Sequence, residues 1–261
     1  MRKVIEVENL KRVYETKTGW FHPKKKEVRA VDGINFFVKE GEIFGLLGEN
    51  GAGKTTTIKM LITLLAPTEG CCRVLGYDCF KEAKKIRHYI NFVFGGEMGV
   101  YRRLSARDNL IYFAGLYNIR GNVAKERSEK LLNLVGLDEV ADQLVETYSK
   151  GMIQRLQIAR GLINNPKIVL MDEPTIGLDP VGANMLRNLI REMKRDGRTV
   201  LLTTHYMQEA DELCDRIAII NKGKIVALDT PEGLKRVYCN EGQDETLEQV
   251  FLNLVGEQHA M

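Results

Sequence analysis

Two adjacent carboxylates end an apolar stretch in the sequence VLMDEPT, residues 169–175. A charge beside a buried strand is costly unless a cation or a reaction uses it. Asp172, at the strand end, can hold a magnesium ion, and Glu173 can polarise a water that attacks a phosphate. Without other evidence, the same residues fit an ordinary Asp-Glu turn closed by Pro174. The pair therefore predicts phosphate chemistry only if a phosphate-binding loop lies at the same sheet edge.

Such a loop is predicted by the sequence GENGAGKTT, which begins at Gly48 and fits the pattern G-x-x-x-x-G-K-[ST]. Gly48, Gly51 and Gly53 let the backbone N–H groups point inward, and the following helix adds the positive end of its dipole. Lys54 supplies a charge for the β- and γ-phosphates, and the Thr55 hydroxyl suits magnesium. A flexible glycine-rich turn is the plain alternative, but it leaves the buried strand, the Lys-Thr pair and the apolar helix unexplained.

Two further segments fit this chemistry. Ser149 and Gly151 precede an amphipathic helix in TYSKGMIQRLQIARGL, so a second helix N-terminus is available for anions, although Ser149 alone reads as a simple N-cap. His205 follows the apolar run LLTT at the same expected edge as Asp172. It can donate to a γ-phosphate oxygen or hold the attacking water. A single histidine after a strand is usually structural, so its role depends on its neighbours.

The pattern of apolar residues predicts the elements that position these groups. Residues 105–147 carry helical periodicity and are expected to form a helical insertion. The alternation elsewhere favours a mainly parallel sheet with helices on both faces. Acids at the carboxyl ends of such strands share an edge with the phosphate loop. Strands are expected at residues 4–10, 31–38, 42–47, 167–171, 198–203 and 216–220, and helices at 58–65, 151–164 and 181–195.

Composition bounds the class of protein. With 261 residues, 44% of them apolar and 28% charged, the chain is long enough for one large α/β domain or two small ones. A net charge of +3 is too small to indicate nucleic-acid binding. The five cysteines form no CxxC pair, which favours a reducing cytosol. No signal peptide and no apolar run of about 18 residues is present, so any membrane role is expected to come through a partner.

These motifs together resemble the ATP-binding subunit of an ABC transporter over nearly the whole chain. GENGAGKTT resembles the Walker A loop, SKGM at 149–152 stands at the place of the LSGGQ signature, and IVLMDE at 168–173 resembles the Walker B strand. IGLDP at 176–180 is similar to the D-loop, His205 to the switch histidine and Tyr14 to the aromatic residue that stacks on adenine.

The resemblance implies an α/β P-loop NTPase fold with a mainly parallel sheet, an N-terminal antiparallel β subdomain and a helical insertion at about 100–160. It implies an ATPase domain over 1–240 and a short helical tail over 241–261. It also implies catalytic roles for Glu173 and His205, and magnesium binding by Thr55 and Asp172. The implied ATP-binding residues are Tyr14, Gly48, Asn50, Gly51, Gly53, Lys54, Thr55, Thr56, Ser149, Gly151 and Asp179.

In that family two such domains close head to tail over two ATP molecules, each signature covering the γ-phosphate bound by the other. This chain has one phosphate loop and one signature, so we expect it to pair with a second copy or a related ATPase subunit. The expected function is ATP hydrolysis that drives a separate transmembrane permease from the inner face of the cell membrane, with ATP and Mg²⁺ as cofactors and no nucleic acid as partner.

The sequence also departs from the family pattern. The signature reads YSKGM, so Lys150 replaces a glycine and Met152 a glutamine, while the small residues nearest the phosphate are kept. In INFVFGGEMG, residues 90–99, the expected Q-loop glutamine is missing, with Gly95 or Gly96 at its position. We hypothesise that Glu97 takes over part of its role. The alternative is that Glu97 lies in solvent and water fills the gap.

Other segments indicate the branch of the family. Residues 15–29 are longer than the usual hairpin and are interpreted as an arm. The tail at 246–256 places Leu247, Val250, Phe251 and Leu254 on one helical face and, like residues 99–117, resembles exporters of drugs, lipids or sodium. Tyr101, Arg102 and Arg103 are candidate permease-docking residues, although exposed basic turns are ordinary surface features.

Two other functions compete with the transport subunit. A soluble ABC ATPase of the iron–sulfur assembly type is the main alternative, which copurification with a polytopic membrane protein would separate. Translation-type members carry two such domains and DNA-repair members carry long coiled-coil insertions, and neither is present. A phosphate-loop kinase or GTPase leaves the ordered motifs unexplained, and the lack of N-K-x-D favours ATP over GTP. The sequence does not specify the cargo.

Overall fold

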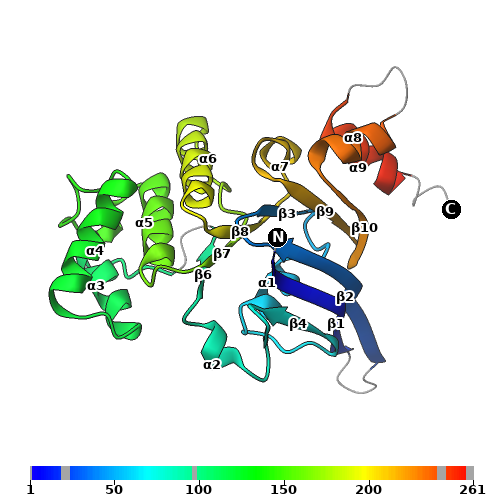
Figure 1. Ribbon diagram of the computed structural model, residues 1–261, viewed down its shortest axis with the longest axis horizontal. Coiled ribbons are helices and arrows are strands. Elements are labelled where there is room, and N and C mark those ends of the chain that lie inside the picture. Colours follow the sequence, from blue (N-terminus) through cyan, green and yellow to red (C-terminus); the bar gives the residue numbers. More distant parts are fainter. Residues whose placement is uncertain (1, 19–23, 96–98, 240–244, 257–261) are drawn as a thin grey trace. The chain divides into compact units, whose positions relative to one another are not determined.

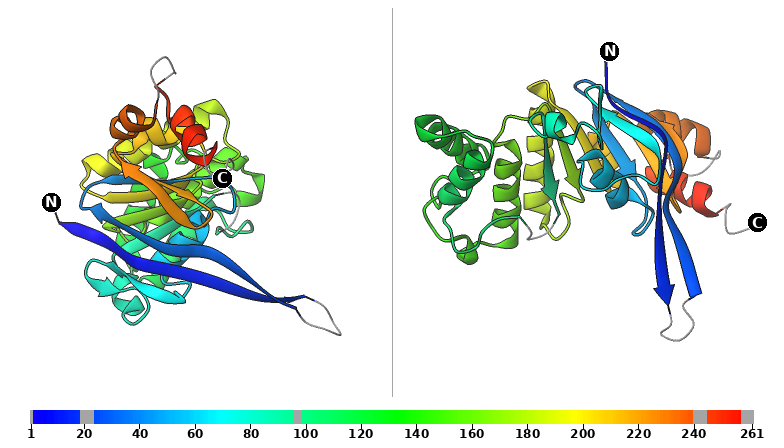
Figure 2. Two further views of the ribbon diagram at one scale, coloured as in Figure 1. Left: turned by 90° about the vertical axis from the view of Figure 1, so that its right-hand side faces the viewer. Right: turned by 90° about the horizontal axis from the view of Figure 1, so that it is seen from below.

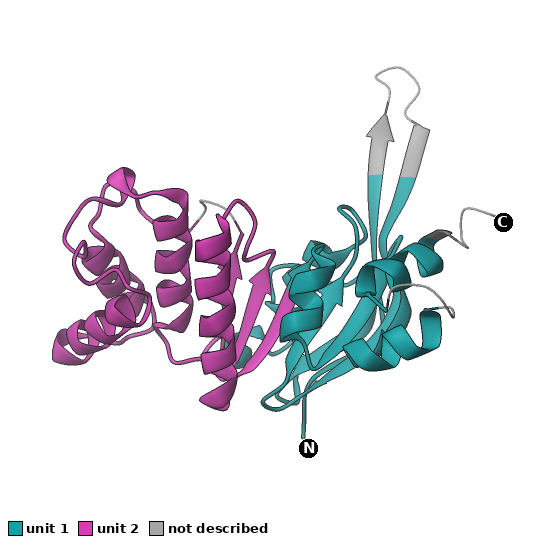
Figure 3. Ribbon diagram, turned by 90° about the horizontal axis from the view of Figure 1, so that it is seen from above, with its two compact units in different colours: residues 1–86, 203–261 teal, residues 87–202 magenta. Residues whose placement is uncertain are grey.

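The structure of the protein, a computed structural model, describes residues 2–18, 24–95, 99–239 and 245–256. It divides into two compact units, unit 1 with residues 1–86 and 203–261 and unit 2 with residues 87–202 (Figure 3). The chain leaves unit 1 after Ile86 and returns to it at Thr203, so unit 2 is inserted between two parts of unit 1.

Unit 1 contains an antiparallel sheet in the order β2-β1-β4-β5. Its strands are β1 (Lys3–Thr18), β2 (Lys24–Lys39), β4 (Glu69–Val74) and β5 (Tyr77–Asp78). The expected strands at 4–10 and 31–38 are therefore too short, because β1 and β2 stay paired through residues that were interpreted as a polar connection (Figure 2). Main-chain pairing of the two strands satisfies their backbone groups whatever the polarity of the side chains.

A second group of strands in unit 1 carries the phosphate loop. In it β3 (Ile43–Leu47) pairs in parallel with β9 (Arg216–Asn221), and β10 (Lys224–Asp229) pairs antiparallel on the other side of β9. Every residue of β3 is buried, which is typical of a central parallel strand. The parallel pairing agrees with the alternation of strands and helices in the sequence.

Helix α1 (Lys54–Leu61) follows β3 directly after the phosphate loop. A helix was expected at 58–65, so the prediction began and ended four residues late. The real start is Gly53, whose left-handed conformation turns the chain into the helix. The real end is set by Thr63, which has a φ of 65° and reverses the backbone.

The remaining helices of unit 1 lie toward the C-terminal end of the chain, except α2 (Ala83–Ile86). They are α7 (Met207–Leu213), α8 (Pro231–Tyr238) and α9 (Leu247–Gly256), and α8 and α9 lie side by side (Figure 1). The apolar face predicted for the tail is buried at Leu247, Val250 and Phe251. Asn253 also donates to the Tyr238 carbonyl at 2.7 Å. The tail therefore packs on its own unit.

Unit 2 combines strands with the helices that lie between them in sequence. Its strands follow the order β8-β7-β6, and β6 (Ile90–Phe94) pairs in parallel with β7 (Ile168–Asp172). The dividing line between the units falls near the end of β8 (Thr199–Thr204). Helix α6 (Pro180–Arg195) follows β7.

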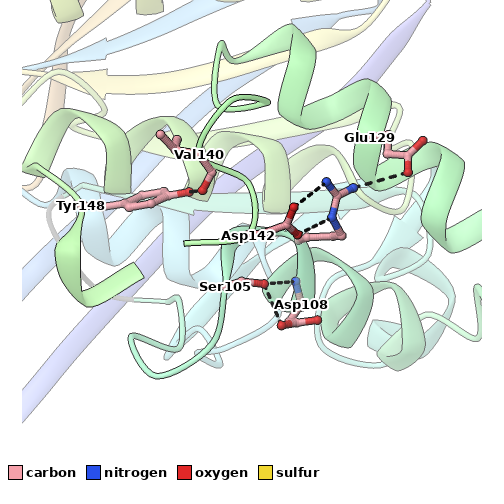
Figure 4. A network of polar contacts seen from close by, with 7 residues as sticks. Ser105, Asp108, Glu129, Val140, Asp142 and Tyr148 are labelled. Carbon is pink, nitrogen blue, oxygen red and sulfur yellow. Dashed lines mark hydrogen bonds and ion pairs between the residues drawn. The ribbon is translucent and has the colours of Figure 1, made fainter. Parts of the chain in front are cut away.

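The expected helical insertion comprises α3 (Ala106–Leu116), α4 (Gly121–Leu134), the 3₁₀ turn η1 (Val145–Thr147) and α5 (Lys150–Leu162). Side-chain contacts fix this region (Figure 4). Ser105 caps α3 by accepting from the Asp108 amide at 3.0 Å, and Arg107 Nε donates to Asp142 at 2.7 Å. The Tyr148 hydroxyl donates to the Val140 carbonyl at 2.7 Å, which fixes the approach to α5.

Candidate functional site

The glycines of the phosphate loop are required by close backbone contacts. A Cβ on Gly48 would lie 2.3 Å from the Ile220 carbonyl oxygen, and one on Gly53 would lie 2.3 Å from the Ala30 carbonyl oxygen. Gly53 also has a φ of 111°, which L-residues rarely adopt. The loop is therefore packed between β2 and β9, and any side chain at either glycine would push it out of place.

Lys54 lies inside this loop. Its side chain is 4% exposed, and its ammonium donates to the Gly48 carbonyl at 2.7 Å and the Glu49 carbonyl at 3.1 Å. The loop thus wraps around a positive charge at the N-terminal end of α1, where Thr55 is exposed and Thr56 partly buried. This cradle fits the phosphate groups of a nucleotide, because it offers an ammonium, hydroxyls and a helix N-terminus.

His205 lies close to the start of the loop. The Gly48 amide donates to the Thr204 carbonyl at 3.3 Å, so the end of β8 lies beside the first loop glycine. His205 comes directly after Thr204 and is partly buried, with its ring centroid 4.1 Å from that of Tyr206. Unit 1 therefore brings together the predicted histidine and the predicted phosphate loop.

Tyr14 lies on β1 opposite Val28 of β2. The Arg12 guanidinium lies over its ring, 4.8 Å from the centroid, and Arg12 also donates to the Ala66 carbonyl at 3.0 Å. An adenine ring that stacks on Tyr14 would therefore use the face of the tyrosine ring opposite Arg12. Sequence reasoning missed Arg12, although its spacing of two residues places it on the same face of the strand.

Asp172 and Glu173 lie in unit 2, where Asp172 is the last residue of β7 and both side chains are partly buried. Glu173 has a φ of 49°, so the chain leaves the strand direction there, as expected. This left-handed conformation costs a non-glycine residue about 1–2 kcal/mol. Strain of this kind is concentrated at functional sites, which supports a special role for Glu173.

The end of β6 explains the missing Q-loop glutamine if Gly95 occupies its position. Phe94 pairs with Asp172 in the parallel register, and Gly95 follows it. A Cβ on Gly95 would lie 2.7 Å from the Glu173 carbonyl oxygen and 2.8 Å from that of Asp172. No side chain fits there without moving the acidic pair. Gly96 and Glu97, and with them the hypothesis for Glu97, lie outside the described residues.

The signature and D-loop segments lie near each other in unit 2. Ser149 is the N-cap of α5, and its Oγ accepts from the Met152 amide at 3.3 Å. Asp179 is the N-cap of α6, and its carboxylate accepts from the Gly182 amide at 2.8 Å. A Cβ on Gly151 would lie 4.0 Å from the Leu178 side chain, so the two segments approach each other at this glycine and leucine.

Sequence reasoning missed two polar residues on α5. Arg160 Nη2 donates to the Phe92 carbonyl at 2.8 Å, and Gln154 Nε2 donates to the Phe94 carbonyl at 3.4 Å. The sequence does carry a signal for them, because both polar residues stand at positions of the helix that its apolar spacing assigns to the inward-facing side. Tyr101, Arg102 and Arg103, the candidate docking residues, are all exposed.

No helix in the described ranges is long and apolar enough to cross a bilayer. The phosphate loop and His205 belong to unit 1, whereas the acidic pair, signature and D-loop belong to unit 2. The predicted residues are thus divided between the two units.

Comparison with known proteins identifies the family. Residues 31–176 match the family model described as ABC transporter. The ABC transporter ATP-binding protein NatA of Bacillus subtilis (strain 168) is 40% identical over 233 residues, which are 89% of this chain and 93% of NatA. A fluoroquinolones export ATP-binding protein of Mycobacterium tuberculosis is 46% identical over 82% of this chain and 69% of its own length.

A solved structure confirms the fold class. It shows a dimeric ATP-binding cassette in a post-hydrolysis state bound to ADP and Pi, with a TM-score of 0.77 and 27% identity, over 87% of this chain and 98% of that one. The predicted P-loop fold, with a mainly parallel sheet, an N-terminal antiparallel sheet and helices, is therefore correct. The chain belongs to the ABC transporter family and is an ATP-binding ATPase subunit whose activity is coupled to transport.

Proposed function

We propose that the chain is the motor subunit of an exporter. It binds ATP with Mg²⁺, pairs head to tail with a second copy or a related subunit, and drives a separate permease from the inner face of the cell membrane. The observation that carries ATP binding, on which the rest of the proposal depends, is the phosphate loop, which encloses the Lys54 ammonium and has glycines where backbone contacts forbid a Cβ. The name of the fluoroquinolones export relative favours export.

Each site residue has a proposed role. Lys54 binds the β- and γ-phosphates, and Thr55 and Asp172 are the proposed magnesium ligands, because a hydroxyl and a carboxylate are hard oxygen donors. Glu173 is the general base and His205 holds the γ-phosphate or the attacking water. The remaining proposed nucleotide contacts are Tyr14, Gly48, Asn50, Gly51, Gly53, Thr56 and, across the paired subunit, Ser149, Gly151 and Asp179.

The proposed ATPase domain covers residues 1–240, with a helical subdomain at about 100–160 and a tail from 241 onward. Tyr101, Arg102 and Arg103 are proposed to contact the permease. Tyr101 is held for this purpose by neighbours within unit 2, since its amide donates to Asn109 at 2.7 Å and its ring lies 5.0 Å from that of Tyr112. The Tyr101 side chain is thus fixed within unit 2.

The dependence of ATP hydrolysis on protein concentration tests the paired site. If two chains complete each site, the rate per chain should rise with chain concentration until the dimer saturates. A constant rate per chain down to concentrations at which only monomer is present would contradict the proposal. Crosslinking in native membranes then tests the permease partner, and recovery of a polytopic membrane protein through Tyr101 or Arg102 is the expected result. Recovery of only soluble proteins would favour an iron–sulfur assembly role.

A further inference from the structure

Arg160 joins α5 to both sides of the segment that follows β6. Its Nη2 donates to the Phe92 carbonyl at 2.8 Å, and its Nη1 donates to the Gly99 carbonyl at 2.9 Å. The guanidinium also lies over the Phe113 ring of α3, 5.3 Å from the centroid. One side chain of the signature helix thus holds a strand, a turn and a second helix, all within unit 2.

Arg160 makes these contacts at the cost of partly removing its charge from water. Burial lowers the pKa of Arg160, because the charged form is removed from water. Among the described residues no carboxylate pairs with it, and its partners are two carbonyls and an aromatic ring. Gly99 is adapted to the same contact, since a Cβ there would lie 2.4 Å from Arg160 Nη1.

The strand held by Arg160 leads to the acidic pair. Phe94 lies two residues beyond Phe92 and pairs in register with Asp172, and Gln154 of α5 donates to its carbonyl at 3.4 Å. The Cβ position of the following Gly95 lies within 2.8 Å of the carbonyls of Asp172 and Glu173. The contacts therefore run from α5, through the end of β6, to the main chain of Asp172 and Glu173, which carries the two carboxylates.

Helix α5 begins at Ser149, the residue proposed to contact the partner's ATP. We infer that Arg160 is a positioning residue that links the signature end of α5 to Asp172 and Glu173 of the same chain. ATP held in one site of the dimer then acts on the carboxylates of the other, so the two sites hydrolyse ATP cooperatively. This inference rests on the proposed function, because it requires the paired arrangement.

The test uses the full-length chain and its variants Arg160→Gln and Arg160→Lys. The Gln variant loses the charge and the two-pronged contact, whereas Lys keeps a charge but reaches one carbonyl at a time. Arg155→Gln is the matched control, because Arg155 lies on the same helix and donates to two carbonyls, those of Val135 and Gly136, both at 3.0 Å. The Arg155→Gln variant therefore loses two hydrogen bonds to carbonyls, as Arg160→Gln does, but neither of them goes to β6.

The readouts are the Hill coefficient of hydrolysis against ATP concentration and the ATP-induced dimerisation of each variant combined with Glu173→Gln. We expect a Hill coefficient approaching about 2 for the unmodified chain and for Arg155→Gln, and a clearly lower value for both Arg160 variants. Dimerisation should change by less than about twofold, because Ser149 and the phosphate loop are intact. If Arg160→Gln fails to fold, the Hill coefficient of Arg160→Lys tests the inference.

Three results would overturn the inference. They are an unchanged Hill coefficient in the folded Arg160 variants, an equal loss in Arg155→Gln, and a Hill coefficient of about 1 in the unmodified chain. In each case ATP hydrolysis and dimerisation by the unmodified chain would leave the proposed function standing. An unmodified chain that neither binds nor hydrolyses ATP would refute the proposed function first.

Discussion

Gly95 lies against Glu173 so closely that a Cβ on it would be 2.7 Å from the Glu173 carbonyl oxygen. Because backbone cannot move as freely as a side-chain tip, a methyl group here must displace either β6 or the acidic pair. We predict that Gly95→Ala destabilises the protein by about 1–3 kcal/mol and lowers kcat more than ATP affinity. Denaturant unfolding and steady-state kinetics measure both effects.

Gly115→Ala is the control for this change, since a Cβ on Gly115 of α3 meets no atom within 4 Å. In a helix, alanine is favoured over glycine by about 0.5–1 kcal/mol, so this variant should be slightly stabilised with normal kinetics. Equal behaviour of the two variants would show that the carbonyl contact at Gly95 has no consequence.

Glu173→Gln separates binding from turnover. The amide keeps the size and hydrogen-bonding reach of the side chain but cannot accept a proton, so ATP should bind normally while kcat falls by about 10²–10⁴. ATP affinity by equilibrium titration and single-turnover hydrolysis provide the measurement. Hydrolysis within a few fold of normal would remove Glu173 from the base role.

Lys54→Ala should instead weaken ATP binding itself. Removal of a charge-assisted contact to phosphate costs about 1.5–3 kcal/mol, which corresponds to a loss of affinity of about tenfold or more. The two loop carbonyls that accept from Lys54, those of Gly48 and Glu49, also lose their donor. Lys59→Ala, an exposed lysine on the same helix, is the control and should bind ATP normally. Unchanged affinity in Lys54→Ala would contradict the placement of the phosphate loop.

The sequence predicted the elements whose signals are local. Strand β3, which is fully buried, and β7, which is buried up to Asp172, follow from continuous apolar runs, and α6 has a local start signal in Asp179 as N-cap with Pro180 after it. The lengths of β1 and β2 could not be predicted, because polar residues at 15–18 and 24–29 are held by pairing between the strands rather than by their own propensity. The start of α1 was missed because its first residues, Lys54–Thr57, are polar and show no helical spacing of apolar side chains.

The same distinction applies to the site. Motifs of a few consecutive residues located the phosphate loop, the acidic pair and the signature. Arg160 and Phe92 are 68 residues apart, and nothing local indicates that they meet. The close approach of Gly95 to Glu173 likewise depends on the parallel pairing of β6 with β7, which brings distant segments together. The missing glutamine was therefore visible in the sequence, but the steric constraint at Gly95 was not.

A buried ion pair in unit 1 offers a test of stability. Arg216 Nη1 lies 3.1 Å from Glu42 Oε1, with side-chain exposures of 13% and 5%, and the guanidinium stacks 4.6 Å from the Phe37 centroid. Glu42→Ala leaves the arginine charge buried without its carboxylate and should cost about 3–5 kcal/mol. Glu69→Ala breaks the exposed Lys11–Glu69 pair and should cost about 1 kcal/mol or less. Equal unfolding free energies for the two variants would contradict this difference.

The Arg107–Asp142 pair predicts a dependence of stability on pH. The hydrogen bond from Arg107 lowers the pKa of Asp142 from its ordinary value of 3.8. The folded state therefore favours the ionised carboxylate. The stability that this pair contributes is fully present above pH 3.8, and it is lost as the pH falls through the lowered pKa of Asp142 in the folded state. Asp142→Asn should be less stable than the unmodified chain at neutral pH.

That difference should shrink as the solution is acidified below pH 3.8, and denaturant midpoints measured across the acid range follow it directly. Because Asp142 is exposed, the difference should also shrink at high salt, which screens the pair. Asp138→Asn removes a negative charge from the same exposed segment without breaking this pair and controls for net charge. A stability difference that grew on acidification would mean that the carboxylate is held in its protonated form, with the opposite sign of linkage.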